Sequence, residues 1–318
     1  MILSRVADAL YWMGRYLERA ENATRLLLVT EELATEVVGL DEDLARAEWA
    51  DLRLIFPGAD AGEARESAAA LDPAAMYGLS VDPRHPSSVF FSLKKARDNA
   101  RTVREALTIE VFVNLNETYR ELGAYTRPDV ADPAAFRSAL SSIHRGLLAT
   151  AGAVEQTLAR DPGWLFVKLG ESMERVFRTA VVLRAKLPGL LSPAPGIDVP
   201  LLHSRWRALL RGLSSLENYR KAHGARMEPA DALEFLLFDP HAPRSLRYGT
   251  ATVKDLLERI SGTGELSLPA RIMGKLAAEL AYQGKEVWDD GRSLGLLDQT
   301  LGELGRAHES LSAAYFGT

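Results

Sequence analysis

The chain contains no cysteine, so disulfides, thiolate zinc sites, iron–sulfur clusters and cysteine nucleophiles are all excluded. It also lacks a basic excess: 38 lysines and arginines stand against 43 acidic residues, for a formal net charge of −5. Proteins that bind nucleic acid or anionic membranes normally carry a basic excess, so we expect no nucleic-acid partner. No apolar run approaches the roughly 18 residues of a membrane span, and the first residues lack the apolar core of a signal peptide. We therefore expect a cytoplasmic protein with no membrane partner.

Several motifs of known chemistry are missing as well. None of the six histidines has a glutamate three residues earlier, which excludes the Glu-x-x-His pairs of di-iron bundles. No His-Glu-x-x-His sequence occurs, and neither do the glycine loops that bind nucleotides or the Gly-x-Ser-x-Gly turn of hydrolases. The sequence thus predicts no metal ion and no cofactor.

What the sequence does contain is helical periodicity along almost its whole length. Apolar residues recur every three or four positions from Val6 to Leu27, which is typical of one buried helix face. A second long helix is predicted from about Ser88 to Leu122, a span without proline or glycine. Asp132 and Asp161 each precede a proline, the pattern of a capping residue followed by the first helical position. Further helices are predicted at residues 201–221, 230–238, 244–260, 268–288 and 294–315, with loops at 56–62, 77–86, 124–132 and 186–200. No strand is predicted, and the fold class is all-α.

The two halves of the chain resemble each other at a nearly constant offset. A shift of 157 residues pairs Trp49 with Trp206, Asp82-Pro83 with Asp239-Pro240 and Ser88 with Ser245. A shift of 156 residues pairs Glu18-Arg19 with Glu174-Arg175. Helices rich in alanine and leucine produce chance matches, but a shared register of less common residues favours an internal duplication. We therefore predict a helical bundle of two similar halves, residues 1–160 and 161–318, related by a pseudo-twofold axis and packed as one compact unit.

Charged residues gather on helix faces that the apolar pattern predicts to be partly buried. On each of the first two long helices, arginines recur at helical spacing with acids and amides beside them. Arginine is the side chain best suited to bidentate contact with carboxylate or phosphate. If the two faces meet, they form a candidate anion cluster, with at least one contact between an acid of the first helix and an arginine of the second. Its members are Arg15, Glu18, Arg19, Glu21, Asn22, Arg97, Asn99, Arg101, Arg104 and Glu105.

These faces have other interpretations. They are also typical of solvated surfaces or of an interhelical ion-pair network. Arg244 and Ser245, at a predicted helix start, are secondary candidates for anion binding, although a simple cap explains them equally. In a catalytic cluster Glu18 would act as general base while arginines hold substrate oxygens. Adjacent arginines lower a glutamate's pKa, which works against a base at neutral pH, so no catalytic residue is assigned and the question of an enzyme stays open.

At the residues of these charged helix faces, and at further segments along the chain, the sequence resembles the bacterial alpha-E domain family. The second half departs from the first at Lys168 and Glu171, which stand where a pattern like Gly14-Arg15 is expected. The matching segments are Leu3 to Ala7, Leu10 to Asn22, Ser92-Leu93, Ala96 to Glu105, Leu169-Gly170, Met173-Glu174-Arg175, Leu216-Glu217, Tyr219-Arg220, Phe235-Leu236-Leu237 and Pro243-Arg244-Ser245.

The resemblance implies an all-helical protein that accompanies, or is fused to, circularly permuted ATP-grasp ligases and transglutaminase-like proteins. That grouping suggests peptide or amide-bond synthesis or modification, with the ATP chemistry belonging to the partner. Three hypotheses follow. The chain is an accessory or adaptor protein for an ATP-grasp amidoligase, or an enzyme of the same pathway whose Glu/Arg cluster binds a carboxylate or phosphate substrate, or a structural homo-oligomer.

Overall fold

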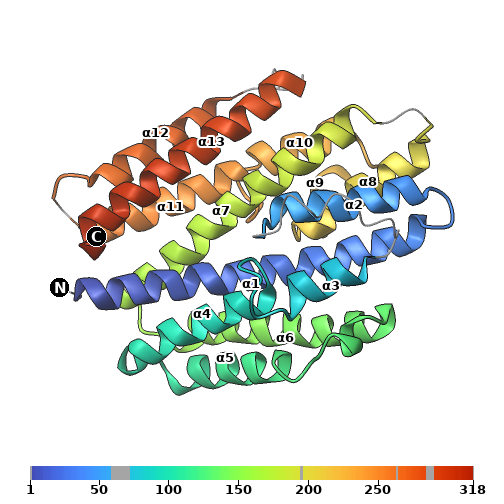
Figure 1. Ribbon diagram of the computed structural model, residues 1–318. Helices are drawn as coiled ribbons and strands as arrows, with labels where there is room; N and C mark the ends of the chain where they lie inside the picture. Colours follow the sequence, from blue (N-terminus) through green and yellow to red (C-terminus); the bar gives the residue numbers. More distant parts are fainter. Residues whose placement is uncertain (1, 59–71, 194–195, 263, 284–289, 318) are drawn as a thin grey trace. The chain divides into compact units, whose positions relative to one another are not determined.

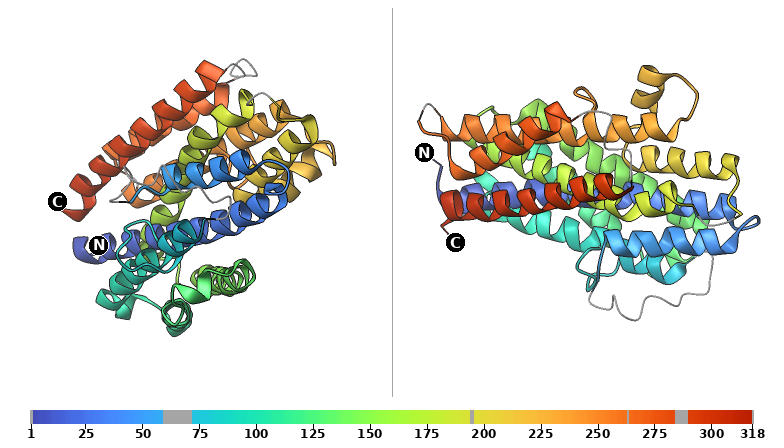
Figure 2. Two further views of the ribbon diagram at one scale, coloured as in Figure 1. Left: turned by 45° about the vertical axis from the view of Figure 1, so that its right-hand side comes forward. Right: turned by 90° about the horizontal axis from the view of Figure 1, so that it is seen from above.

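The computed structural model describes residues 2–58, 72–193, 196–262, 264–283 and 290–317, and these ranges contain helices, turns and loops but no strand (Figure 1). The all-α prediction is confirmed. Figure 2 shows the same helices from two further directions. Contacts divide the chain into two compact units, Ala9–Val167 and Lys168–Thr318, the latter joined by Met1–Asp8. No helix in the described ranges combines the length and the apolarity that crossing a bilayer requires.

The unit Ala9–Val167 is built mainly of long helices with amphipathic faces. Helix α5 packs along α6 and also against α4, to which a short turn connects it. The core of this unit contains the fully buried side chains of Leu27, Trp49, Leu115 and Phe136. The elements are α1 (Ser4–Val37), α2 (Glu42–Ile55), α3 (Pro73–Ser80), α4 (Val89–Thr102), the 3-10 turn η2 (Arg104–Ala106), α5 (Ile109–Leu122), the 3-10 turn η3 (Pro128–Val130) and α6 (Pro133–Thr157).

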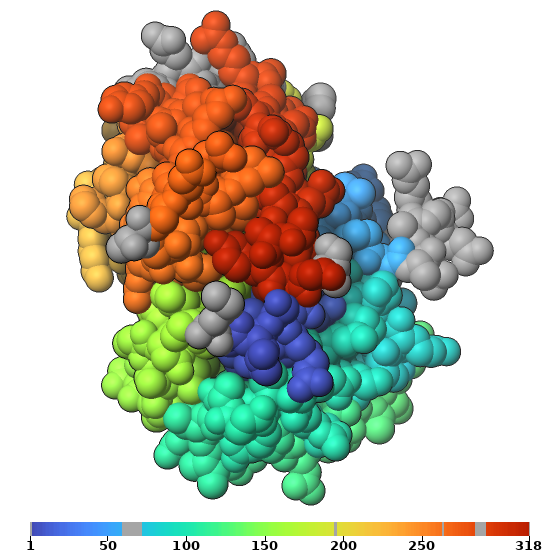
Figure 3. All heavy atoms as spheres, turned by 90° about the vertical axis from the view of Figure 1, so that its left-hand side faces the viewer, coloured from blue at the N-terminus to red at the C-terminus, as the bar shows by residue number. Residues whose placement is uncertain are grey.

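The unit Lys168–Thr318 contains most of α7 and all the helices that follow it. Helices α11, α12 and α13 pack in succession, and Figure 3 shows α12 and α13 adjoining on the surface, in orange to red. Trp206, Tyr219 and Leu297 are among its fully buried side chains. The elements are α7 (Pro162–Leu191), α8 (Val199–Gly212), α9 (Leu216–His223), α10 (Pro229–Phe238), α11 (Leu246–Ser261), α12 (Leu268–Tyr282), α13 (Asp290–Leu311) and the π-helical turn η5 (Ser312–Phe316).

Two helix starts predicted from Asp-Pro pairs are confirmed. Helix α6 begins at Pro133, and the Asp132 carboxylate accepts a hydrogen bond of 2.8 Å from the backbone N–H of Ala135. Helix α7 begins at Pro162, where Asp161 accepts one of 3.0 Å from the N–H of Trp164. Each aspartate satisfies an N–H that the first helical turn leaves without a partner, and proline has no such N–H to satisfy.

The prediction of one continuous helix from Ser88 to Leu122 is wrong. Helix α4 ends at Thr102 and α5 begins at Ile109. Between them, Val103 (φ −129°, ψ 35°) and Thr108 (φ −72°, ψ 162°) leave the helical region. The break turns α5 back along α4 and buries Val103 and Leu107, at 1% and 7% exposure. Burial of apolar side chains thus breaks the helix without proline or glycine.

Other boundaries differ from the predictions as well. The predicted helix at 201–221 is two helices, because Ser214 adopts a left-handed conformation with φ 48° between α8 and α9. The predicted loop from residue 186 starts too early, since α7 continues to Leu191 with Pro188 inside its last turn. There Arg205 donates a hydrogen bond to the backbone oxygen of Gly189, which the helix end leaves open.

Two helices were not predicted from the sequence. One is α3, which overlaps the predicted loop at 77–86. The other is α2, whose N-cap Asp41 accepts from the N–H of Leu44 at 2.9 Å. The predicted loop at 56–62 and the predicted helix end at Trp288 lie partly outside the described residues.

Candidate functional site

One face of α1 carries charged and amide side chains that are almost entirely buried. Arg15, Glu18, Glu21, Asn22 and Arg25 are exposed by 8%, 5%, 9%, 0% and 5%. With 3.6 residues per turn these positions form one continuous arc, and the half-buried Arg19 lies at its edge. We call these six residues the α1 stripe. For this helix the solvated-surface interpretation is wrong.

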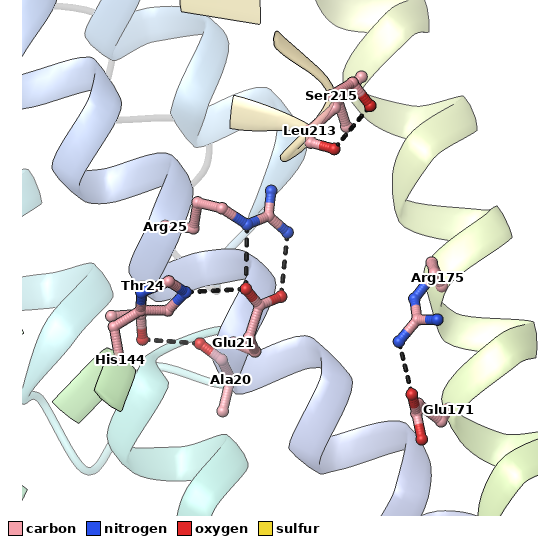
Figure 4. A network of polar contacts seen from close by, with 9 residues as sticks. All are labelled: Ala20, Glu21, Thr24, Arg25, His144, Glu171, Arg175, Leu213 and Ser215. Atoms are coloured by element: carbon pink, nitrogen blue, oxygen red, sulfur yellow. Dashed lines mark hydrogen bonds and ion pairs between the residues drawn. The ribbon is translucent and has the colours of Figure 1, made fainter. Parts of the chain in front are cut away.

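Glu21 is the centre of a polar network in the unit Ala9–Val167 (Figure 4). Arg25 donates two hydrogen bonds to it, Nε to Oε1 and Nη2 to Oε2, both of 3.0 Å. On α6, His144 Nε2 lies 2.9 Å from Glu21 Oε1. Such a bidentate pair fixes the guanidinium plane, so the Arg25 side chain is held in one orientation.

Aromatic rings of α1 position the other two arginines of the stripe. The Arg15 guanidinium lies 5.1 Å from the centre of the Trp12 ring, and its Nη1 donates to the Tyr11 hydroxyl at 3.5 Å. The Arg19 guanidinium lies 5.0 Å from the Tyr16 ring. Contact with an aromatic face stabilises a cation, so the rings help to hold both guanidiniums in place.

Asn22 is buried, and no hydrogen bond compensates for the loss of water around its carboxamide. Its side chain is 0% exposed, and neither Oδ1 nor Nδ2 has a hydrogen-bond partner in the structure. A buried polar group without a partner costs about 1–3 kcal/mol, and such groups are uncommon in folded proteins. The carboxamide is therefore a position where a bound polar molecule would gain hydrogen bonds.

The structure does not bring the arginines of the second predicted helix to the acids of the first. Arg97, on α4, donates from Nε to Asn116 Oδ1 at 2.7 Å and covers the Tyr119 ring at 4.8 Å. Arg104, in η2, covers the Phe112 ring at 4.6 Å. All of these partners lie on α5, because α5 folds back along α4.

The predicted contact of Glu18 or Glu21 with Arg97, Arg101 or Arg104 is accordingly wrong. In the described part of the chain these three arginines have no ion pair with either acid. Arg101 and Glu105 are exposed, and Asn99 donates to the backbone oxygen of Lys95 at 3.0 Å.

The secondary candidates lie at the start of α11. Ser245 Oγ accepts from the N–H of Tyr248 at 3.0 Å and donates to the backbone oxygen of Asp239. The hydroxyl is thus a cap with both hydrogen-bonding roles used. Arg244, directly before it, is half-buried.

Charged residues that were not part of the predicted anion cluster also gather on α7, in the unit Lys168–Thr318. Glu171 accepts from Lys168 Nζ at 2.6 Å. It also accepts from Arg175 Nη2 at 2.5 Å, a contact drawn in Figure 4. Glu174 is 0% exposed and accepts from Arg178 Nε at 2.9 Å. The 156-residue alignment of Glu174-Arg175 with Glu18-Arg19 contained the signal for this second cluster.

Two pairs between α1 and α6 had no sequence signal. Besides His144 on Glu21, Arg137 Nη1 donates to Glu31 Oε1 at 2.6 Å, and Glu31 is 0% exposed. The partners are 123 and 106 residues apart, and no local spacing identifies them.

The composition of the α1 stripe favours oxygen anions as ligands. The stripe contains three guanidiniums, those of Arg15, Arg19 and Arg25. Guanidinium groups pair with carboxylate or phosphate oxygens. In the ranges that the structure describes, no three histidine, aspartate or glutamate side chains are grouped as metal ligands.

Comparison with known families gives one match that spans nearly the whole chain. The Alpha-E family model, described as a predicted alpha-helical domain with a conserved ER motif, matches residues 2–316. The chain contains three Glu-Arg dipeptides, Glu18-Arg19, Glu174-Arg175 and Glu258-Arg259. The first belongs to the α1 stripe, and the second lies on α7 among the charged residues described above, Lys168, Glu171, Glu174, Arg175 and Arg178.

The curated relatives are much longer than this chain. Uncharacterized protein Mb2597 of Mycobacterium bovis and uncharacterized protein Rv2567 of Mycobacterium tuberculosis are each 28% identical to it over 320 residues. The match covers 96% of this chain and 35% of each relative, so the chain spans about a third of their length. No solved structure matches the chain.

Proposed function

Since the chain belongs to the Alpha-E family, with residues 2–316 matched, we propose that it is an accessory helical protein that partners an ATP-grasp amidoligase in peptide or amide-bond synthesis or modification. The observation that supports this proposal is the length of the relatives. Their region similar to this chain makes up only 35% of the polypeptide, so there the helical domain is attached to a longer companion segment. A ligase, or a transglutaminase-like protein, as the companion comes from the family resemblance.

The roles of the chain and of its partner follow from the motifs and side chains that the chain contains. It has no nucleotide-binding glycine loop, so the partner would bind ATP and activate the carboxylate. The α1 stripe supplies guanidiniums that would hold an anionic part of the substrate. Because the ligation consumes ATP, we place it in the cytoplasm.

The test is capture of the tagged full chain from its native cell, followed by reconstitution. We expect an ATP-grasp ligase to co-purify in comparable amount, and its amide product to be lost when this chain is omitted. A ligase that stays unassociated and fully active without the chain would overturn the proposal. Light scattering on the same preparation tests whether the chain forms a homo-oligomer.

The second candidate function is an enzyme of the same pathway that binds an anionic substrate at the α1 stripe. The buried Arg15 and Arg25 beside the unpartnered Asn22 favour it. Turnover by the purified chain alone, reduced in Arg15→Ala but not in a variant of exposed Arg101, would support an enzyme. Turnover that appears only with the ligase present would support the accessory role.

We also propose that the two halves arose by duplication and are related by a pseudo-twofold axis. Local structure supports this. Helices α2 (Glu42–Ile55) and α8 (Val199–Gly212) have the same length at the 157-residue offset, and α4 and α11 begin at that offset too. Trp49 and Trp206 are both buried, at 1% and 0% exposure. Crystallography of the whole chain would test the symmetry.

A further inference from the structure

The unit Ala9–Val167 carries a second group of cations, at the surface of the adjacent helices α4 and α5 (Figure 1). Lys94, Arg97 and Arg101 recur every three or four residues along α4, and Arg104 follows in η2. Among the residues that the structure describes, none of these four cations has an acid as an ion-pair partner. We call this surface the α4–α5 face; it consists of Lys94, Arg97, Arg101, Arg104, Ile109 and Val113.

From this surface we infer that the α4–α5 face binds an acidic amphipathic helix of a partner protein. Carboxylates of that helix pair with the cations of α4 and η2, and its aliphatic side chains cover the two apolar residues of α5. The inference rests on the proposed accessory role, for which it names the docking surface and the chemistry of the docked segment.

Contacts with α5 hold two arginines of the face in place without neutralising them. The hydrogen-bond acceptor of Arg97 is the uncharged Asn116, at 2.7 Å, and its guanidinium lies 4.8 Å from the centre of the Tyr119 ring. The guanidinium of Arg104 lies 4.6 Å from the Phe112 ring. Both cations are thus oriented before a partner arrives, which lowers the entropic cost of pairing with its carboxylates.

The helix at the 157-residue offset, α11, compensates its own charge. There Lys254 stands in the place of Arg97 and Glu258 in the place of Arg101, and Lys254 Nζ lies 3.3 Å from Glu258 Oε2. On α4 the glutamate is replaced by a second cation, and like charges at this i,i+4 spacing repel each other. Asp98, between the two arginines, forms an ion pair with neither. Carboxylates of a partner would supply on α4 the compensation that α11 has within its own chain.

The spacing of the charged and apolar residues favours a helix as the docked segment. Lys94 and Arg101 are seven residues apart, or about 10 Å along the axis of α4. A second helix with acids at i, i+3 or i+4, and i+7 has the same spacing, so each cation can meet one carboxylate. Ile109 and Val113 are exposed by 63% and 41%, and they flank Phe112, the ring that Arg104 covers. Aliphatic side chains beside the acids of the partner would bury this apolar pair.

Other features of the surface disfavour a nucleic acid. The rings of Phe112 and Tyr119 are occupied by guanidiniums, whereas single-stranded nucleic acids use such rings to stack their bases. The exposed Glu110 and Glu117 lie beyond Val113 at helical spacing, and they would repel a phosphate backbone that crosses the face. A single helix is narrow enough to contact the basic side alone.

Fluorescence anisotropy with three labelled peptides of about 16 residues tests the inference on the full chain. The first peptide has glutamates and leucines at helical spacing, the second has glutamine in place of each glutamate, and the third has serine in place of each leucine. We expect the first to bind about tenfold more tightly than either of the others, and its affinity to fall as salt rises from about 50 to about 300 mM. A single-stranded DNA oligonucleotide is the fourth probe and should not bind.

Charge reversal on the face supplies the matched variants. Arg101→Glu should weaken binding of the glutamate–leucine peptide by at least about tenfold, because it places like charges against each other. Arg101 is exposed, so the variant should fold; Lys94→Glu, also exposed, should act in the same direction and replaces it if its melting temperature falls. Arg145→Glu makes the same charge change at an exposed position of α6 and should leave the affinity unchanged.

The outcomes separate this inference from the accessory role. Equal affinities of Arg101→Glu and Arg145→Glu for the peptide would overturn the inference, as would a peptide that does not bind or an oligonucleotide that binds more tightly. The capture of the ligase is then repeated with both variants. If the ligase co-purifies equally with them, the partner docks elsewhere, so the inference fails while the accessory role stands. If no ligase co-purifies with the unchanged chain but the peptide binds as expected, the accessory role fails and the docking surface stands.

Discussion

Glu21 and Arg25 meet on one face of α1 through two parallel hydrogen bonds, each of 3.0 Å. Their side chains are exposed by only 11% and 7%, and His144 adds a third contact to the same carboxylate. The pair has the spacing of many surface ion pairs that contribute little to stability. Burial changes its role, because removing either charge leaves the other in a medium that solvates it poorly.

We therefore expect Glu21→Gln to lower the free energy of unfolding by about 3 kcal/mol, near the lower end for breaking a buried ion pair. Urea unfolding monitored by circular dichroism would measure it. Glu42→Gln is the matched control, since Glu42 pairs with Arg46 at the same i,i+4 spacing but is 66% exposed. The control should change stability by less than about 0.5 kcal/mol. Equal effects in the two variants would show that the Glu21 pair is solvated.

A second prediction concerns the close approach of α5 and α6. A Cβ atom on Gly146 would lie 2.3 Å from Thr118 Oγ1 and 3.1 Å from its methyl group, whereas on Gly152 of the same helix it meets nothing within 4 Å. Gly146→Ala should thus destabilise the protein by about 1–3 kcal/mol through overpacking. Gly152→Ala should stabilise it by up to about 1 kcal/mol, the difference in helix propensity. Thermal unfolding of both variants compares them, and a stabilising Gly146→Ala would mean that Thr118 moves aside freely.

The helix starts were predictable because their cause is local. Asp132 and Asp161 cap the turn that follows them, and the sequence contains both the cap and the proline. The break between α4 and α5 was not predictable, since residues 103–108 contain neither proline nor glycine and the turn is favoured by burial of Val103 and Leu107. Pro188 gave the opposite error, because α7 continues past this proline to Leu191.

The same distinction applies to the candidate site. The buried α1 face followed from helical periodicity, which a sequence displays directly. The partners of its charges did not, because His144 approaches Glu21 across 123 residues of chain. The expected arginines of α4 and η2 were assigned to the wrong neighbours for the same reason: the turn that sends them toward α5 is a tertiary feature.

A third prediction uses the two serine caps at the 157-residue offset. Ser88 Oγ accepts from the N–H of Phe91 at 3.0 Å and donates to the backbone oxygen of Asp82 at 2.7 Å. Ser245 makes the corresponding bonds with Tyr248 and Asp239. Each serine-to-alanine change should cost about 1–2 kcal/mol, and the double variant should lose the sum, because the caps share no partner.

Chemical denaturation of the two single variants and the double variant would check this. The exposed Ser138→Ala, inside α6, serves as the control and should stay within about 0.5 kcal/mol of the unchanged protein. A cap whose loss has no effect would indicate that water replaces its hydroxyl. Unequal losses at Ser88 and Ser245 would weaken the case for two equivalent local structures.

The last prediction is a pH dependence centred on Tyr219. Its side chain is 1% exposed, and its hydroxyl accepts from the N–H of Glu228 at 3.2 Å and donates to the backbone oxygen of Arg226 at 3.3 Å. Burial is the main cause that raises the pKa of this phenol above its ordinary value of 10.0, and the negative charges of Asp231 and Glu228 add to it, against a lowering by the Glu228 N–H. Above about pH 10 the unfolded chain therefore loses the phenolic proton while the folded chain keeps it. Because the folded state then binds more protons, the free energy of unfolding falls as the pH rises.

Comparison with Tyr219→Phe isolates this contribution from those of other groups that titrate in the same range. Near pH 8 the phenylalanine variant should be less stable by about 1 kcal/mol, since it lacks the hydroxyl's hydrogen bonds. As the pH rises through 10, the unchanged protein loses stability that the variant does not, so the difference between them should shrink. Urea unfolding at several pH values between about 8 and 11 measures that difference. A difference between Tyr219→Phe and the unchanged protein that stays constant over this pH range would contradict the raised pKa of Tyr219.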